Sequence, residues 1–241
     1  MEWLSYLSFT GGGWGDELLR GLGVTLALAA VTLPLGLALG LAVAAMALFG
    51  GRLLRALAVG FSTTIRGLPE LLTLFIIYHG VGLAINSLLK WHNPGATPVE
   101  LSPFLAGVVA LGLVFAGYSS EVWRGAWQAL DPGQLEAAQA IGVRRLTIFR
   151  LIELPQLLRL ALPGLGNLWV SLIKDTALVS VIALNDLMRM ANIAVGVTKK
   201  PFLFFAVVCL IYWAICLLCE WALARLERRA NRGFEREGHT A

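Results

Sequence analysis

The chain has 241 residues, of which 58% are hydrophobic and only 14% charged, and its mean hydropathy is +0.75. Soluble globular domains carry about 25% charged residues, so this composition excludes a soluble enzyme or a disordered linker. It indicates instead that lipid surrounds most of the chain. The net charge of +4 comes from basic residues that flank apolar runs, which favours a role in membrane orientation over nucleic-acid binding.

Five apolar runs predict five membrane-spanning helices. About 20 apolar residues cross a bilayer, and neither residues 21–51 nor residues 101–120 contain a single charge. The first run is too long for a signal peptide. We place the spans at residues 21–50, 56–85, 101–123, 158–184 and 201–223 of a single all-α transmembrane domain that covers residues 1–241.

Two of the spans carry local features that bear on packing. Gly36 and Gly40 form a Gly-x-x-x-Gly pair, which would let another helix approach closely. The second span is interrupted by Arg66-Gly67-Leu68-Pro69-Glu70. Because proline removes a backbone donor and disfavours helix at the residue before it, we expect one long helix that is broken or kinked here.

The basic residues predict the orientation of the chain. Twelve Lys and Arg residues lie on one side of the predicted membrane and five on the other. Since basic residues gather in cytoplasmic loops, the N-terminus is expected outside and the C-terminus inside. The twelve are Arg52, Arg55, Arg124, Arg144, Arg145, Arg150, Arg159, Arg225, Arg228, Arg229, Arg232 and Arg236.

The longest predicted cytoplasmic segment contains two short helical patterns. Asp131-Pro132 is typical of a helix start, with the aspartate as cap and the proline in the first turn. The patterns cover residues 133–141 and 143–152, and Pro155 is expected to end the second. An amphipathic pair of this kind could lie on the lipid surface or dock into a groove on another protein.

The spacing in this segment resembles a known signature. Glu136-Ala137-Ala138 is followed by Gly142, Ile152 and Leu154-Pro155 at the spacing found in permease subunits of bacterial ATP-binding-cassette (ABC) importers. Arg66-Gly67-Leu68-Pro69 and Lys174-Asp175-Thr176 resemble the same stretches of polar amino-acid permeases. Within that family the chain is most similar to the histidine/lysine/arginine/ornithine and opine type, and the resemblance extends from about residue 18 to 225.

The resemblance implies a type I importer permease in the bacterial inner membrane. It would pair with a second permease, either a related chain (a heterodimer, which we favour) or a copy of itself. Two cytoplasmic ATPases and an external solute-binding protein would complete the importer. Residues 131–155, here termed the coupling loop, would dock on the ATPase through Glu136, Ala137, Ala138, Gly142, Ile152, Leu154 and Pro155.

The chain itself is not expected to be an enzyme. None of its four lysines stands in a Gly-x4-Gly-Lys-Ser/Thr motif, so it cannot hydrolyse ATP alone. ATP and Mg²⁺ would therefore be bound by the partner ATPases, and we expect no cofactor in this chain. We also expect no metal site, because its histidines have no acidic residue or cysteine clustered nearby.

Ionisable residues within the spans are the candidate substrate ligands, since a charge in lipid is costly unless it is paired or faces water. The carboxylates of Glu70 and Asp175 could bind the ammonium or guanidinium of a basic amino acid, with Tyr118 as a cation–π wall. Arg66 could bind the substrate carboxylate. In the structural alternative, Arg66 and Glu70 form an internal salt bridge that steadies the kink. The full predicted set is Arg66, Gly67, Glu70, Tyr118, Glu121, Asp175 and Thr176.

Other functions are less well supported by the sequence. A membrane-embedded enzyme would need a Ser–His, Asp–Asp or metal arrangement within the spans, and none has a telling spacing. A secondary carrier would be expected to show an inverted repeat, and we detect none. The remaining alternative is the same machinery importing neutral or acidic amino acids such as glutamine or glutamate.

Overall fold

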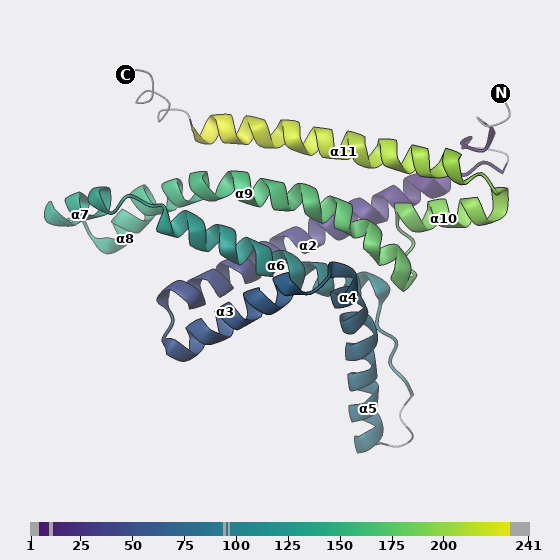
Figure 1. Cartoon of the computed structure of the whole chain (residues 1–241), viewed down its shortest axis with the longest axis horizontal. Coiled ribbons are helices and arrows are strands. Elements are labelled where there is room, and N and C mark those ends of the chain that lie inside the picture. The colour runs from purple at the N-terminus through teal and green to yellow at the C-terminus, as the bar shows by residue number, and fades with distance from the viewer. Residues whose placement is uncertain (1–4, 10–11, 94, 96, 232–241) are drawn as a thin grey trace.

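The computed structural model describes residues 5–9, 12–93, 95 and 97–231, and this part of the chain is helical without any strand (Figure 1). Four long helices run roughly along the long axis of the molecule: α2 (Gly15–Phe49), α6 (Pro103–Gln128), α9 (Leu154–Asp175) and α11 (Pro201–Ala230). Five helical segments of the described chain are long and apolar enough to cross a membrane. This agrees with the predicted all-α membrane protein.

The centre of the fold is the packing of α2 against α6. Gly36 and Gly40 of α2 are buried there, and a Cβ atom on Gly40 would lie 2.0 Å from Ser119 Oγ of α6. A Cβ on Gly36 would lie 2.7 Å from the Phe115 ring. The prediction that this glycine pair admits a neighbouring helix is confirmed, because side chains of α6 occupy the space that both residues leave.

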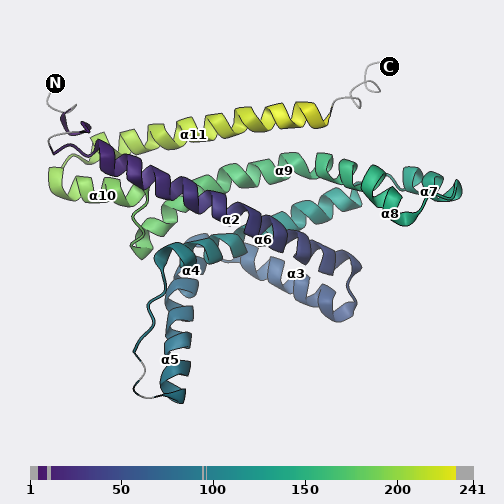
Figure 2. The same ribbon diagram turned by 180° about the vertical axis from the view of Figure 1, so that it is seen from behind.

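The predicted break at Pro69 is present, and it separates helices that run in different directions. α3 (Arg52–Gly67) lies alongside α2 and α6, and it ends at Leu68 in extended conformation. The chain then forms α4 (Glu70–Phe75), a π-helical stretch (Ile76–Val81) and α5 (Gly82–His92), which projects away from the long helices in both views (Figures 1 and 2). The predicted span 56–85 is thus divided, and the apolar segment of spanning length is Glu70–His92.

The two ends of the long helices carry different short elements. At one end lie α7 (Pro132–Ala140), α8 (Arg145–Ile148) and a π-helical stretch (Phe149–Glu153), together with the α2–α3 turn and the end of α11 (Figure 1). At the other lies α10 (Leu187–Thr198), which follows a 3-10 stretch (Thr176–Ile182). The basic residues predicted as cytoplasmic lie in the first group, apart from Arg124 near the end of α6, Arg159 near the start of α9, and Arg232 and Arg236, which lie outside the described residues.

A buried carboxylate starts α10. Asp186 is fully buried, and its carboxylate accepts hydrogen bonds from the backbone N–H groups of Met188 (3.2 Å) and Arg189 (3.0 Å). The backbone N–H of Leu187, which directly follows Asp186, donates to Thr25 Oγ1 of α2 at 3.1 Å. Burial raises the pKa of Asp186 to about 6, although its hydrogen bonds from the backbone oppose this shift.

Asp186 predicts a pH dependence of stability. Between about pH 4 and 6 the unfolded chain loses this proton while the folded chain keeps it, so the free energy of unfolding should fall as the pH rises through this window, by at most about 3 kcal/mol. Asp186→Asn retains an acceptor for the helix cap and removes the charge. Its melting temperature should therefore change less between pH 4 and 6 than that of the wild type. Equal changes in the two proteins would contradict this assignment.

Candidate functional site

A small cavity lies among α4, α6 and α9. Its volume is about 120 Å³, room for several water-sized groups, and it is lined by Glu70, Leu111, Val114, Phe115, Tyr118, Leu168, Ser171, Leu172 and Asp175. Three of the predicted substrate residues, Glu70, Tyr118 and Asp175, thus meet in one place. They come from three different helices, because α6 brings Tyr118 between the start of α4 and the end of α9.

The polar groups of the cavity include two carboxylates and no cationic group. Two carboxylates, one phenol and the Ser171 hydroxyl face a wall that is otherwise apolar, and none of its lining residues is cationic. Ser171 was not among the predicted residues. It precedes Asp175 by four positions and so shares its helix face, a periodicity that could have identified it. An apolar cavity with convergent carboxylates has the chemistry to bind a cation.

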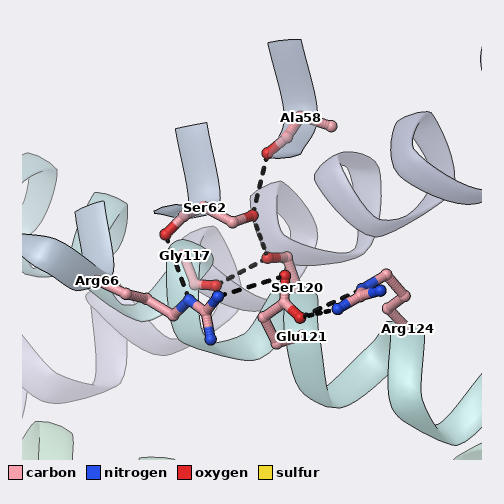
Figure 3. A network of polar contacts seen from close by, with 7 residues as sticks. All are labelled: Ala58, Ser62, Arg66, Gly117, Ser120, Glu121 and Arg124. Atoms are coloured by element: carbon pink, nitrogen blue, oxygen red, sulfur yellow. Dashed lines mark hydrogen bonds and ion pairs between the residues drawn. The ribbon is translucent and has the colours of Figure 1, made fainter. Parts of the chain in front are cut away.

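Arg66 lies outside this lining and makes an ion pair with Glu121, not with Glu70. Its guanidinium is 3.8 Å from Glu121 Oε1, and its Nε donates to the Ser62 carbonyl oxygen at 3.3 Å (Figure 3). Glu121 also pairs with Arg124, three residues further along α6. The Arg66–Glu70 salt bridge considered as the structural alternative does not form: the break at Pro69 places the two residues on separate helices, and α6 supplies the carboxylate instead.

This ion cluster fastens the end of α3 to α6. Ser62 of α3 and Ser120 of α6 share a hydrogen bond of 2.9 Å, and both hydroxyl groups are buried (Figure 3). Close approach is possible because Gly117 has no side chain, and a Cβ there would lie 2.7 Å from Ile65. Arg66 and Glu121 are thus paired with each other within the chain. Charges in a membrane need such a partner, and these two have one without a bound substrate.

The two remaining predicted substrate residues also lie away from the cavity. Thr176 is fully buried, and its hydroxyl donates to the Ile173 carbonyl oxygen at 2.6 Å and lies 3.4 Å from the Tyr212 hydroxyl of α11. Gly67 is exposed, and a Cβ there would meet nothing within 4 Å. Of the seven predicted residues, three line this cavity: Glu70, Tyr118 and Asp175.

The coupling loop forms a compact projection at one end of the molecule. Asp131 Oδ1 accepts a hydrogen bond from the Gly133 N–H (2.9 Å), so the predicted cap is confirmed. Gly142 turns the chain between α7 and α8 with φ of +77°, a value that glycine adopts without strain. Gln156 at the start of α9 donates to Gln134 of α7 at 2.9 Å.

Pro155 does not end a helix as expected. The helical segment runs unbroken from Arg145 to Ile182, and Pro155 occupies the first turn of α9, directly after the π-helical stretch. The regular i→i−4 hydrogen bonding is already interrupted by the π-helical stretch Phe149–Glu153, and Pro155 lies directly after it. The outward surface of the loop includes Glu136 and Ala137, and the Ile141 side chain is 80% exposed, whereas Ala138 and Ile148 are buried.

Comparison with known proteins assigns the family. Residues 16–232 match the family model of the binding-protein-dependent transport system inner membrane component. The chain belongs to this family. It is accordingly a permease subunit of an ABC importer rather than a catalytic enzyme.

The permease has curated relatives that align over nearly its whole length. It is 37% identical to the octopine transport system permease protein OccQ of Rhizobium radiobacter, over 98% of this chain and 99% of the relative. It is 36% identical to the histidine/lysine/arginine/ornithine transport system permease protein HisQ of Escherichia coli (93% and 97%). It is 40% identical to the arginine ABC transporter permease protein ArtQ of the same organism (91% and 96%).

Solved structures share the fold of the permease. A crystal structure of an amino acid ABC transporter with histidines superposes with a TM-score of 0.76 at 32% identity, covering 90% of this chain and 95% of that one. The MetNI methionine ABC transporter in an inward-facing conformation superposes with a TM-score of 0.68 at 19% identity, over 88% and 95% of the two chains, which shows likeness of fold alone. The predicted type I importer permease fold is thereby confirmed.

Proposed function

We propose that this permease carries basic amino acids or opines across the bacterial inner membrane, and that Glu70 and Asp175 bind the cationic group of the substrate. The observation that carries the proposal is that both carboxylates line one small cavity without a cationic residue in its wall. A guanidinium or ammonium placed there would replace the water that otherwise solvates the two charges. The relatives named for octopine, for histidine, lysine, arginine and ornithine, and for arginine support this class of cargo.

The other cavity residues suit the same cargo. Tyr118 presents an aromatic ring to a bound cation, and Ser171 can donate or accept one hydrogen bond. The cavity of about 120 Å³ is below the usual size of a small-molecule site, so it suits the cationic head group better than a whole amino acid.

The importer is proposed to contain the partners that its family implies. A second permease, related to this chain or a copy of it, would complete the membrane pathway, and two ATPases would hold ATP and Mg²⁺ in the cytoplasm. An external solute-binding protein would deliver the substrate. The coupling loop supports the docking of the ATPase, because Glu136, Ala137 and Ile141 are exposed at the end of the molecule and α7 is tied to α9 behind them.

The test is ATP-driven uptake of labelled arginine, glutamine and glutamate by the assembled importer in vesicles. The wild type should prefer arginine. Glu70→Gln and Asp175→Asn should each lower arginine uptake at least about tenfold, because a charge-assisted contact of about 1.5–3 kcal/mol is removed. Glu220→Gln is the matched control, since Glu220 lies in α11 and is not part of the cavity.

Two outcomes would contradict the proposal. Arginine uptake that is unchanged in both cavity variants would remove the carboxylates from the substrate pathway. A wild type that prefers glutamine or glutamate would assign the permease to neutral or acidic amino acids, and Glu70 and Asp175 would then need a structural explanation.

A further inference from the structure

We infer that an apolar crevice between α11 and the rest of the permease binds an anionic phospholipid from the cytoplasmic leaflet. The crevice has a volume of about 430 Å³ and lies among α2, α9 and α11. Its lining is almost entirely apolar and includes Leu37, Leu162, Leu165, Trp169, Ala222 and Leu226. It is distinct from the cavity that holds the two carboxylates, and it shares no lining residue with that cavity.

α11 borders the crevice along its length and packs against the rest of the fold through α9 and α10. α11 packs closely on α9 at Gly166, where a Cβ would lie 2.0 Å from the Leu223 side chain, and it also contacts α10 near its own start. Along α11 the lining runs from Leu218 to Leu226, about 12 Å at the helical rise. This length is close to the ~15 Å of hydrocarbon in one leaflet, so an acyl chain can lie in the crevice over most of its depth.

Basic side chains stand at one end of the same crevice. Arg159 precedes Leu162 by three residues on α9, and Arg229 follows Leu226 by three residues on α11, so each continues the lining face of its helix. The helices are antiparallel, and the contact between Gly166 and Leu223 brings residue 159 level with residue 230. Both arginines therefore lie about one helical turn beyond the apolar lining, at the predicted cytoplasmic end of the crevice.

Neighbouring charges strengthen the preference for an anion. Arg228 and Arg225 lie beside Arg229 on α11, and the Arg225 guanidinium is stacked 3.6 Å from the Trp221 ring centroid. Glu227 is the only acidic residue in the last two described turns of α11. An arginine guanidinium binds phosphate bidentately, and basic pockets between membrane helices on the cytoplasmic side bind anionic head groups. The predicted orientation places this end in the cytoplasm, and the inference depends on it but not on the identity of the cargo.

The test is native mass spectrometry of the assembled importer in mild detergent, with added phosphatidylglycerol or phosphatidylcholine of identical acyl chains. The wild type should retain phosphatidylglycerol preferentially. Arg159→Gln with Arg229→Gln should weaken that retention about 25-fold, since each basic residue near the membrane surface contributes about fivefold in affinity. Arg52→Gln is the control, because Arg52 is an exposed arginine at the start of α3, away from the crevice.

A second measurement, fluorescence quenching by brominated lipid, locates the lipid. It uses the wild type and a tryptophan variant, so it is independent of how the arginine variants fold. Trp169 lines the crevice, so phosphatidylglycerol with brominated acyl chains should quench the wild type more than it quenches Trp169→Phe. Equal retention of the two lipids, or no difference in quenching at Trp169, would overturn the inference. Cross-linking of Cys219, which also lines the crevice, to the second permease without any lipid effect would assign the crevice to that partner instead.

Discussion

Gly40→Leu should prevent the permease from folding. A side chain at this position has no space, because even its first carbon would lie 2.0 Å from Ser119 Oγ and 3.1 Å from the Ala116 carbonyl oxygen. Relief would require α2 and α6 to separate along the contact that forms the centre of the fold, so we expect a loss of about 3 kcal/mol or more in the free energy of unfolding. The yield of monodisperse protein after extraction and its melting temperature are the measurements.

Gly23 provides a matched control for this change. It lies in the same helix, is exposed, and a Cβ there would meet nothing within 4 Å. Gly23→Leu should therefore keep the yield and melting temperature of the wild type, because leucine is a better helix former than glycine and this position faces no neighbour. If the two leucine variants behave alike, the close α2–α6 contact is not required for folding.

Glu136→Lys should uncouple the permease from its ATPase. The Glu136 side chain is exposed on α7 and forms no ion pair with another described residue, so the subunit itself should remain folded. If the loop docks on the ATPase, reversal of a charge at the contact costs several kcal/mol. We expect ATP-driven uptake to fall at least tenfold and less ATPase to copurify with the permease.

The control for the coupling loop is the same reversal elsewhere at that end of the molecule. Glu227 lies in the last turns of α11, outside the coupling loop, so Glu227→Lys should leave both uptake and copurification of the ATPase unchanged. Normal uptake by the Glu136→Lys importer, with the usual amount of ATPase, would show that this part of the coupling loop does not contact the ATPase.

Features that depend on local backbone chemistry were predictable from the sequence. Pro69 breaks its helix because it lacks an N–H, and Asp131 caps α7 because its side chain reaches the N–H of Gly133. Gly36 and Gly40 also identified a close helix contact, although not the helix that makes it. Long apolar runs identified the membrane helices because the bilayer thickness sets their length.

Features that depend on pairing between distant residues were not predictable. Arg66 and Glu70 are four residues apart and suggested a pair, yet Arg66 binds Glu121, which is 55 positions away on α6. No periodicity connects such residues, and the choice between the two carboxylates depends on how α3 packs against α6. The short helix α10 was missed because its twelve residues are too few to indicate a span. The burial of Asp186 was missed because it depends on how α10 packs against α2.

The helical segment from Arg145 to Ile182 is unbroken, so about 45 Å of continuous helix joins the coupling loop to Asp175. If this segment tilted by about 5° about its loop end, Asp175 would move by about 4 Å. Tyr118 is carried by a different helix, α6. A tilt of α9 that α6 did not follow would therefore change the shape of the cavity that the two residues line.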